Sequence, residues 1–118
     1  MIISLGDRAE FVAGDETAIR EILHPHRTPL EIRYSLAHAR VKPGRTSKPH
    51  RLASTEVYYI PEGTGEMHID DEISMVAPGH TVYIPPHSTQ FICNTGSADL
   101  KFICIVDPAW QAEDEEVL

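Results

Sequence analysis

The sequence predicts an all-β protein, a sandwich or barrel built from short strands. Glycine and proline number 7 and 9 among the 118 residues, and most of them interrupt the middle of the chain, where they favour turns. The segments between them are only 4 to 9 residues long, and several are rich in Val, Ile, Tyr or Phe, as strands are. Many short strands at near-regular spacing are typical of a sandwich or barrel.

One short helix is expected before the strands, at residues 16–23. Asp15 can cap its first turn and Pro25 ends it. The segment carries an apolar stripe of three residues, Ile19, Ile22 and Leu23. Seven strands should follow, at residues 33–41, 56–60, 66–69, 73–76, 81–84, 89–93 and 100–106.

Two turns are predicted to close antiparallel hairpins, one at Asp70-Asp71 and one at residues 94–99, which contain Gly96. In the second hairpin no register would bring Cys93 and Cys104 within the roughly 7 Å between Cα atoms that a disulfide needs. We therefore expect two free thiols, as in a reducing compartment.

Length and composition indicate one domain over residues 1–118. The chain is 42% hydrophobic and 24% charged, close to the globular average. Lys and Arg total 10 against 18 Asp and Glu, and the net charge of -8 repels nucleic acid phosphates and anionic lipid. Neither nucleic acid nor a membrane is expected as a partner.

The ends of the chain carry two further expectations. The longest apolar run, residues 102–106, is far short of the roughly 20 residues that cross a bilayer. Residues 1–7 lack the basic start and long apolar stretch of a secretory signal, so we expect a cytoplasmic location. Residues 107–118 read as an acidic, solvated tail, anchored by Trp110 either on the domain itself or on a partner subunit.

Two spaced motifs stand in the middle of the chain. The first, over residues 44–63, has Gly44, His50, Leu52, Glu56 and Gly63 separated by five, one, three and six residues. The second, over residues 79–94, has Gly79, Pro85, Gln90 and Asn94 separated by five, four and three residues. Together they resemble the two motifs of the cupin superfamily and span about half of the chain.

The resemblance implies a cupin barrel, that is, a double-stranded β-helix or jelly roll. It also implies a divalent metal inside the barrel, because the family binds one with two His and a Glu of the first motif and a His of the second. This sequence keeps His50 and Glu56 but has Leu52 and Gln90 at the other two positions. Small cupins of this kind commonly dimerise through N-terminal strands, so a homodimer using residues 1–5 is expected.

The alternation of side chains along each strand predicts which residues face the core, independently of the cupin resemblance. Side chains alternate between the two faces of a strand, so Glu56 and Tyr58 share a face with Ile60, as Gln90 does with Ile92. If the isoleucines face the core, the polar side chains face it too. A buried carboxylate needs a metal, a cation or a hydrogen-bond partner, since leaving it charged and alone costs several kcal/mol.

Two arrangements would satisfy that requirement. In the first, His50, Glu56 and Gln90 hold Mn, Fe, Ni, Co or Zn, although this donor set is weaker than the full set of histidines. In the second, Gln90 donates a hydrogen bond to Glu56, and His50 completes a buried polar network without metal. Leu52 favours the second, because it replaces a ligand with an apolar side chain.

Two functions follow from these arrangements. The first is a metal-assisted isomerase, lyase or hydrolase acting on a small metabolite, with Glu56 and Tyr58 as candidate catalytic residues. In it the Tyr58 hydroxyl donates a proton or orients a substrate oxygen, although the same residue could serve only as core packing with a polar tip. The second is a non-catalytic module that binds a small molecule or a metal.

Overall fold

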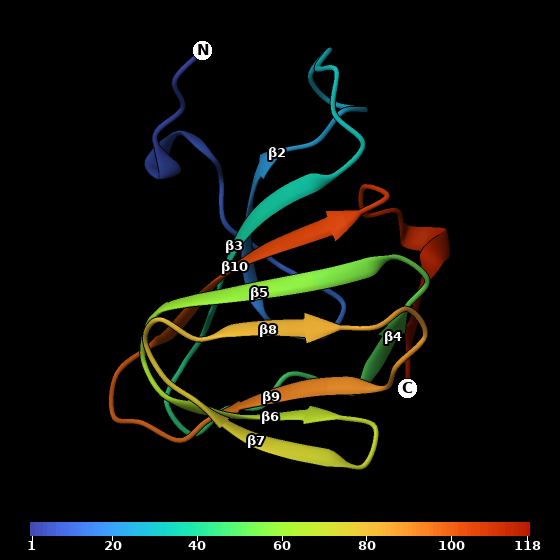
Figure 1. Cartoon of the computed structure of the whole chain (residues 1–118). Helices are drawn as coiled ribbons and strands as arrows, with labels where there is room; N and C mark the ends of the chain where they lie inside the picture. The colour runs from blue at the N-terminus through green and yellow to red at the C-terminus, as the bar shows by residue number, and fades with distance from the viewer.

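The computed structural model describes residues 1–118 as two antiparallel β-sheets packed face to face (Figure 1). The six-stranded sheet contains, in spatial order, β1 (Phe11–Val12), β2 (Ala18–Leu23), β3 (Ser35–Val41), β10 (Leu100–Asp107), β5 (Thr55–Glu62) and β8 (Thr81–Ile84). The five-stranded sheet contains β11 (Glu115–Val117), β4 (His50–Leu52), β9 (Gln90–Asn94), β6 (Gly65–Ile69) and β7 (Glu72–Val76). Two 3-10 turns, η1 (Leu5–Asp7) and η2 (Ala112–Asp114), complete the structure.

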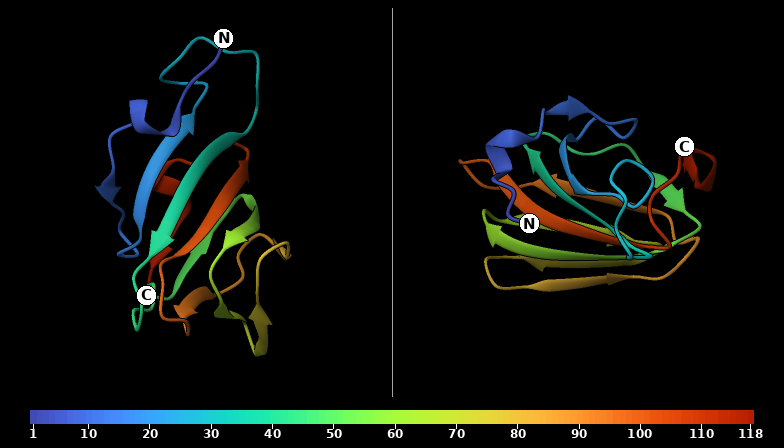
Figure 2. Two further views of the ribbon diagram at one scale, coloured as in Figure 1. Left: turned by 90° about the vertical axis from the view of Figure 1, so that its left-hand side faces the viewer. Right: turned by 90° about the horizontal axis from the view of Figure 1, so that it is seen from above.

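The order of the strands confirms the all-β jelly roll. Strand β10 lies between β3 and β5, and β9 lies between β4 and β6, so strands far apart in sequence are neighbours in each sheet. Figure 2 shows the twist of the six-stranded sheet and the N-terminal segment running along its β1 and β2 side. No helix in the structure has both the length and the apolar character needed to cross a bilayer.

The prediction of a helix at residues 16–23 is wrong, because most of this segment is strand β2. It pairs with β3 on one side and β1 on the other. Asp15 does bond the residue two positions on, as a cap would, but its Oδ1 accepts from the backbone and hydroxyl of Thr17 in a turn. A helix of eight residues gains little by itself, whereas pairing within the sheet satisfies the backbone groups of β2.

The two predicted turns have different outcomes. Asp70-Asp71 joins β6 to β7 in an antiparallel hairpin, as expected. Residues 94–99 close no hairpin, because β9 and β10 belong to different sheets. The Asn94 side chain holds this crossing loop by donating to the carbonyls of Val41 and Ala98 and accepting from the Gly96 amide. The cysteines are free, as expected, but they lie in separate sheets rather than along one ladder.

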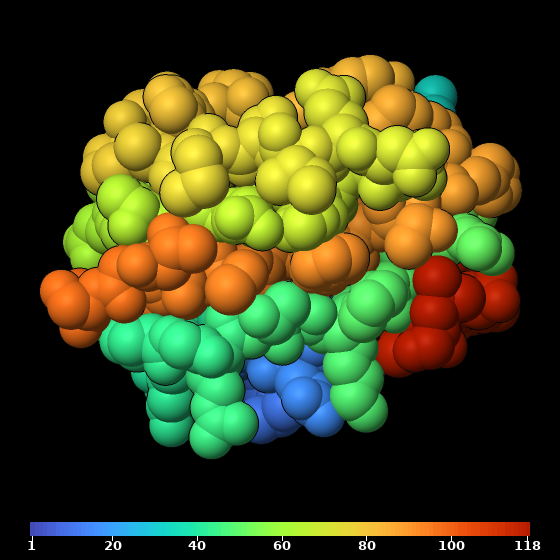
Figure 3. Space-filling model, turned by 90° about the horizontal axis from the view of Figure 1, so that it is seen from below, coloured from blue at the N-terminus to red at the C-terminus, as the bar shows by residue number.

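The C-terminal residues form part of the barrel, which corrects the prediction of a solvated tail. Residues 115–117 form β11, which pairs with β4 from Leu52 to His50. Seen from below, the C-terminal residues, in red, lie against the green segment that includes β4 (Figure 3). Trp110 anchors this segment on its own chain, where its side chain lines a cavity.

The interior confirms the alternation read from the sequence. Glu56, Tyr58 and Ile60 of β5 are 7%, 4% and 0% exposed, so all three face inward. Away from the polar residues, apolar side chains fill the barrel, among them Ile60, Met67, Val76, Ile92 and Leu100. We call this the apolar end of the barrel. Gly63 of the first motif lies there with φ of +91°, and a Cβ on it would come within 2.7 Å of the Leu100 Cα atom, so only glycine fits.

Candidate functional site

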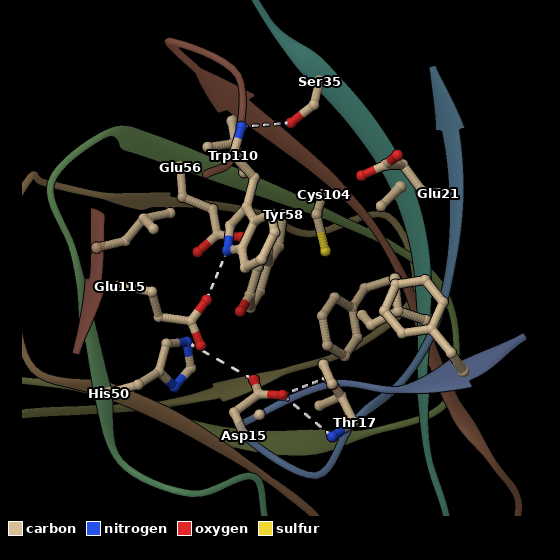
Figure 4. A pocket seen from close by; sticks show the side chains of 18 of the residues that line it. Asp15, Thr17, Glu21, Ser35, His50, Glu56, Tyr58, Cys104, Trp110 and Glu115 are labelled. Carbon is tan, nitrogen blue, oxygen red and sulfur yellow. Dashed lines mark hydrogen bonds and ion pairs between the residues drawn. The ribbon is translucent and has the colours of Figure 1, made fainter. Parts of the chain in front are cut away.

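A cavity of about 290 Å³ lies between the sheets on the side of β1, β2, β4 and β11 (Figure 4). Part of its wall is apolar and comes mainly from Phe11, Val12, Ile19, Ala37, Leu52, Phe102 and Val106. The rest is polar and includes Asp15, Thr17, His50, Glu56, Tyr58, Cys104 and Glu115. We call the region around Asp15, His50, Glu56, Tyr58 and Gln90 the polar end of the barrel.

A chain of hydrogen bonds crosses the polar end. The Tyr58 hydroxyl donates to Gln90 Oε1 over 3.0 Å, and Gln90 Nε2 donates to Glu56 Oε1 over 3.0 Å. Gln90 is 1% exposed, and both of its polar atoms are engaged by these two contacts. The Gln90–Glu56 bond is the one expected in the metal-free arrangement.

His50 lies outside this chain. Its Nδ1 lies 2.8 Å from the carbonyl oxygen of Lys48 and donates to it, since a carbonyl can only accept. Nε2 is therefore directed away from the backbone, 3.7 Å from Asp15 Oδ2. That distance is too long for a hydrogen bond. His50 and Gln90 are directly opposite each other in the β4–β9 ladder. Gln90 bonds Glu56, and His50 and Glu56 line the same cavity.

Two carboxyl groups that the sequence analysis missed complete the polar wall. Asp15 comes from the turn before β2 and Glu115 from the start of β11, and the two are 100 positions apart in the sequence. Figure 4 shows both carboxyl groups next to the His50 ring. The only sequence signal was the Asp15 and Thr17 pair, which also suits a helix cap; nothing marked Glu115 within the acidic run.

Trp110 is held rigidly over the cavity. Its indole Nε1 donates to Glu115 Oε2 over 2.5 Å, its backbone N–H donates to Ser35 Oγ over 3.0 Å, and its carbonyl accepts from His24 Nε2 over 2.7 Å. His24 is buried in the turn after β2. His24 and Ser35 therefore fix the Trp110 backbone, and Glu115 fixes the indole.

Burial controls protonation at the polar end. Removal from water is the main cause that raises the pKa of Glu56 to about 8; the Gln90 hydrogen bond lowers this pKa, and the nearby Asp15 and Glu115 carboxyl groups raise it. Burial also raises the pKa of Tyr58 and of the Cys104 thiol well above their usual ranges. At neutral pH all three side chains are neutral, and Glu56 is a protonated acid.

The predicted ligand set of His50, Glu56 and Gln90 does not fit a shared metal ion as the side chains are arranged. Gln90 Oε1 accepts from Tyr58, and the amide nitrogen of Gln90 faces Glu56. Nowhere in the structure are three His, Cys, Asp or Glu side chains grouped so that they could hold a metal ion. No chemical step is therefore derived through a metal.

Positive charge is scarce around the cavity. Four carboxyl groups, those of Asp15, Glu21, Glu56 and Glu115, line it against one arginine and one histidine. The arginine, Arg27, is largely exposed and pairs with Glu21 over 2.7 Å. No free cationic side chain faces the interior.

A family model described as "Cupin domain" matches residues 37–106. An uncharacterized protein of Methanocaldococcus jannaschii, MJ1618, is 39% identical over 109 residues, which are 92% of this chain and 86% of that protein. The matched segments include both sequence motifs.

Solved structures are similar in fold. The structure titled a predicted oxalate decarboxylase from Thermotoga maritima is 19% identical with a TM-score of 0.80, over 92% of this chain and 99% of that one. A cupin 2 conserved barrel domain protein from Salinispora arenicola is 18% identical with a TM-score of 0.78, over 96% and 90%. A variant of oxalate decarboxylase from B. subtilis is 20% identical with a TM-score of 0.83, over 98% of this chain but 32% of that one. At these identities the likeness is one of fold.

Proposed function

The chain belongs to the cupin domain family, and from that premise we propose that it binds a small organic molecule in the cavity beside His50 and Glu56. The observation that carries the proposal is a partly apolar cavity with polar atoms open to it. No fully buried side-chain nitrogen or oxygen lacks a hydrogen-bond partner, yet His50 Nε2 has none, so it is reachable from the cavity. A concave apolar site with a few convergent polar groups is typical of ligand binding.

Although structural neighbours include oxalate decarboxylases, we do not propose oxalate as the ligand of this cavity. A dicarboxylate needs positive charge or a bound metal to offset its own charge. The Asp15 and Glu115 carboxyl groups, which have no arginine or lysine partner, would repel it, and Arg27 is engaged by Glu21. The acidic wall therefore favours a different ligand.

Proton transfer is a second candidate function, and the protonation of Glu56 favours it. A carboxyl group with a pKa of about 8 holds a proton near neutral pH and can deliver it to a ligand in the cavity. Tyr58 donates to Gln90 rather than into the cavity, so we assign it a positioning role, in which it orients Gln90 and through it Glu56. The predicted isomerase, lyase or hydrolase activity would then depend on Glu56 as the acid.

A divalent metal and a homodimer stay predictions. A metal held by His50, Glu56 and Gln90 would require Gln90 to release the Tyr58 hydroxyl. Elemental analysis of the purified protein tests it, and stoichiometric metal that disappears in His50→Ala would support it. For the dimer, Met1, Ile2 and Leu5 are exposed on this chain, and sedimentation velocity of the intact chain checks their pairing.

The binding proposal can be tested with compounds recovered from the protein itself. Small molecules released by denaturing the purified protein would be identified by mass spectrometry and titrated back. Trp110 is the single tryptophan and lines the cavity, so its fluorescence reports occupancy. We expect a recovered compound to rebind and Ala37→Leu, which narrows the cavity, to weaken rebinding at least tenfold.

The matched control is Ala53→Leu, because Ala53 is exposed and outside the cavity. It should leave affinity unchanged. Absence of any recovered compound, together with no response of Trp110 to a fragment collection covering cations, neutral molecules and anions, would overturn the proposal.

A further inference from the structure

Three acceptor atoms at the polar end have no protein donor. Asp15 uses Oδ1 for Thr17 and leaves Oδ2 toward His50, while Glu115 uses Oε2 for Trp110 and leaves Oε1 free. His50 uses Nδ1 for the Lys48 carbonyl, so the neutral form of the ring presents the lone pair of Nε2. A ligand placed beside these atoms has to supply hydrogen-bond donors.

These acceptors belong to side chains that are held in place. His50 and Asp15 are 5% and 8% exposed, and a backbone or side-chain partner fixes the other polar atom of each. Figure 4 shows the Glu115 and Asp15 carboxyl groups flanking the His50 ring on one side of the cavity. This is a preformed acceptor site, unlike acidic residues that are scattered over a surface.

The charge of this wall narrows the ligand further. Asp15 and Glu115 have no lysine or arginine partner, and the arginine at the cavity pairs with Glu21. An ammonium group supplies three donors and one positive charge, which match three acceptors and an acidic wall. A metal ion would need ligands converging on one point, and no such group is present.

The apolar part of the lining defines the rest of the ligand. Phe11, Ile19, Phe102 and Val106 also line the cavity, and the Trp110 ring lies near the acceptors. Apolar surface favours a compact hydrocarbon body, and aromatic faces attract a cation placed over them. A cavity of about 290 Å³ has room for a body of at least one aromatic ring.

We propose that the cavity selects a small primary amine in its ammonium form, with the charged group between Asp15, Glu115 and His50 and an apolar body against Phe102. This inference rests on the proposed binding function and names its ligand class.

The test compares three probes of one shape and different charge: benzylammonium, benzyl alcohol and benzoate, titrated at pH 7 with Trp110 fluorescence as the signal. We expect benzylammonium to bind at least tenfold more tightly than benzyl alcohol, and benzoate to bind more weakly than either. Because the attraction is partly between charges, added salt should weaken benzylammonium more than benzyl alcohol.

Isosteric variants separate charge from shape. Asp15→Asn keeps the acceptor for Thr17, and Glu115→Gln keeps the acceptor for the indole, so both preserve the fold while removing a negative charge. Each should lower benzylammonium affinity about tenfold and leave benzyl alcohol affinity unchanged. Glu116→Gln is the control, because Glu116 is the exposed neighbour of Glu115 on the same strand; circular dichroism confirms folding of all three.

The outcomes distinguish the two proposals. Equal affinity for the three probes would overturn the selection of an amine and leave small-molecule binding standing. Tightest binding of benzoate, or no binding of any probe while a recovered compound rebinds, would also overturn the ammonium assignment alone. Failure of every probe, recovered compound and fragment would remove both.

Discussion

The two ends of the barrel share strands β5 and β9 but have different interiors. Along β5 the inward side chains change from Glu56 and Tyr58 to Ile60, and along β9 they change from Gln90 to Ile92. At the apolar end the side chains fill the space between the sheets, and the largest of them are 0% to 1% exposed. At the polar end a cavity remains open.

The difference shows how stability and function are separated in a small barrel. Close packing of apolar groups at one end supplies most of the hydrophobic stabilisation. The other end contains a buried carboxyl group and an unfilled cavity, and both features reduce stability. We therefore expect substitutions at the apolar end to act on folding, and those at the polar end to act on pH dependence and binding.

The largest effect should come from truncation at the apolar end. Ile60 is 0% exposed, and Ile60→Ala removes buried methyl groups from a filled space. We expect it to lower the free energy of unfolding by about 2–5 kcal/mol, measured by urea denaturation. Ile73→Ala, at an exposed site, is the control and should change it by no more than about 0.5 kcal/mol. Equal effects of the two would mean that the apolar end is not tightly packed.

The next effect concerns Glu56 and pH. Its pKa is about 8 in the folded protein against 4.5 as the ordinary value, so the unfolded chain releases this proton first as pH rises. The free energy of unfolding should therefore fall between about pH 5 and pH 8 and level off above, while below about pH 4.5 the contribution is complete. Each pKa unit is worth about 1.4 kcal/mol, and from these two pKa values we expect a fall of roughly 3–4 kcal/mol between pH 5 and pH 8.

Glu56→Gln tests this dependence, because a glutamine cannot ionise. Urea denaturation at pH 5, 6.5 and 8 should show a smaller fall in the variant than in the wild type. Asp15 and Glu115, which face Glu56, are present in both proteins, so the difference between the two curves reports on Glu56. Glu72→Gln, at an exposed position, should follow the wild type. Parallel curves for Glu56→Gln and the wild type would show that Glu56 ionises normally.

The smallest effect should come from Tyr58→Phe. The variant keeps the ring contact with Phe102, whose centroid lies 4.4 Å away, and loses only the hydroxyl that donates to Gln90. We expect a loss of about 1–2 kcal/mol, because Gln90 Oε1 is left buried without a donor. Measurement at pH 6 keeps Glu56 protonated. Tyr59→Phe, on the exposed face of β5, is the control, and an equal response of the two would argue against the hydrogen-bonded chain.

The sequence predicts the middle of this fold well because Gly and Pro delimit each strand there. It fails where neighbouring residues admit two structures: the apolar stripe of 16–23 suits a helix, yet β3 supplies a partner that makes the segment a strand. It fails again at 94–99, because a short loop with Gly96 resembles a hairpin turn whether or not the flanking strands share a sheet. Partners in a sheet are set by packing across the whole chain.

The candidate site divides in the same way. Motif spacing and alternation place His50, Glu56, Tyr58 and Gln90 together, because these residues lie on regular strands. Asp15 and Glu115 were missed because neither belongs to a motif, and only the docking of the segments that carry them brings the two carboxyl groups to His50. Asp15 and Glu115, which we propose select the ligand, are thus the residues of the site that local sequence patterns predict least.

The distance in sequence between Asp15 and Glu115 has a consequence during protein synthesis. A nascent chain that has emerged through β10 carries every strand of the apolar end, so that end can begin to assemble while the ribosome is still adding residues. The acceptor site formed by Asp15, His50 and Glu115 cannot exist until Glu115 has emerged and β11 has docked on β4. A chain truncated before that point would retain the apolar end but lack the complete binding site. Ligand binding is therefore expected only for chains that were translated past Glu115.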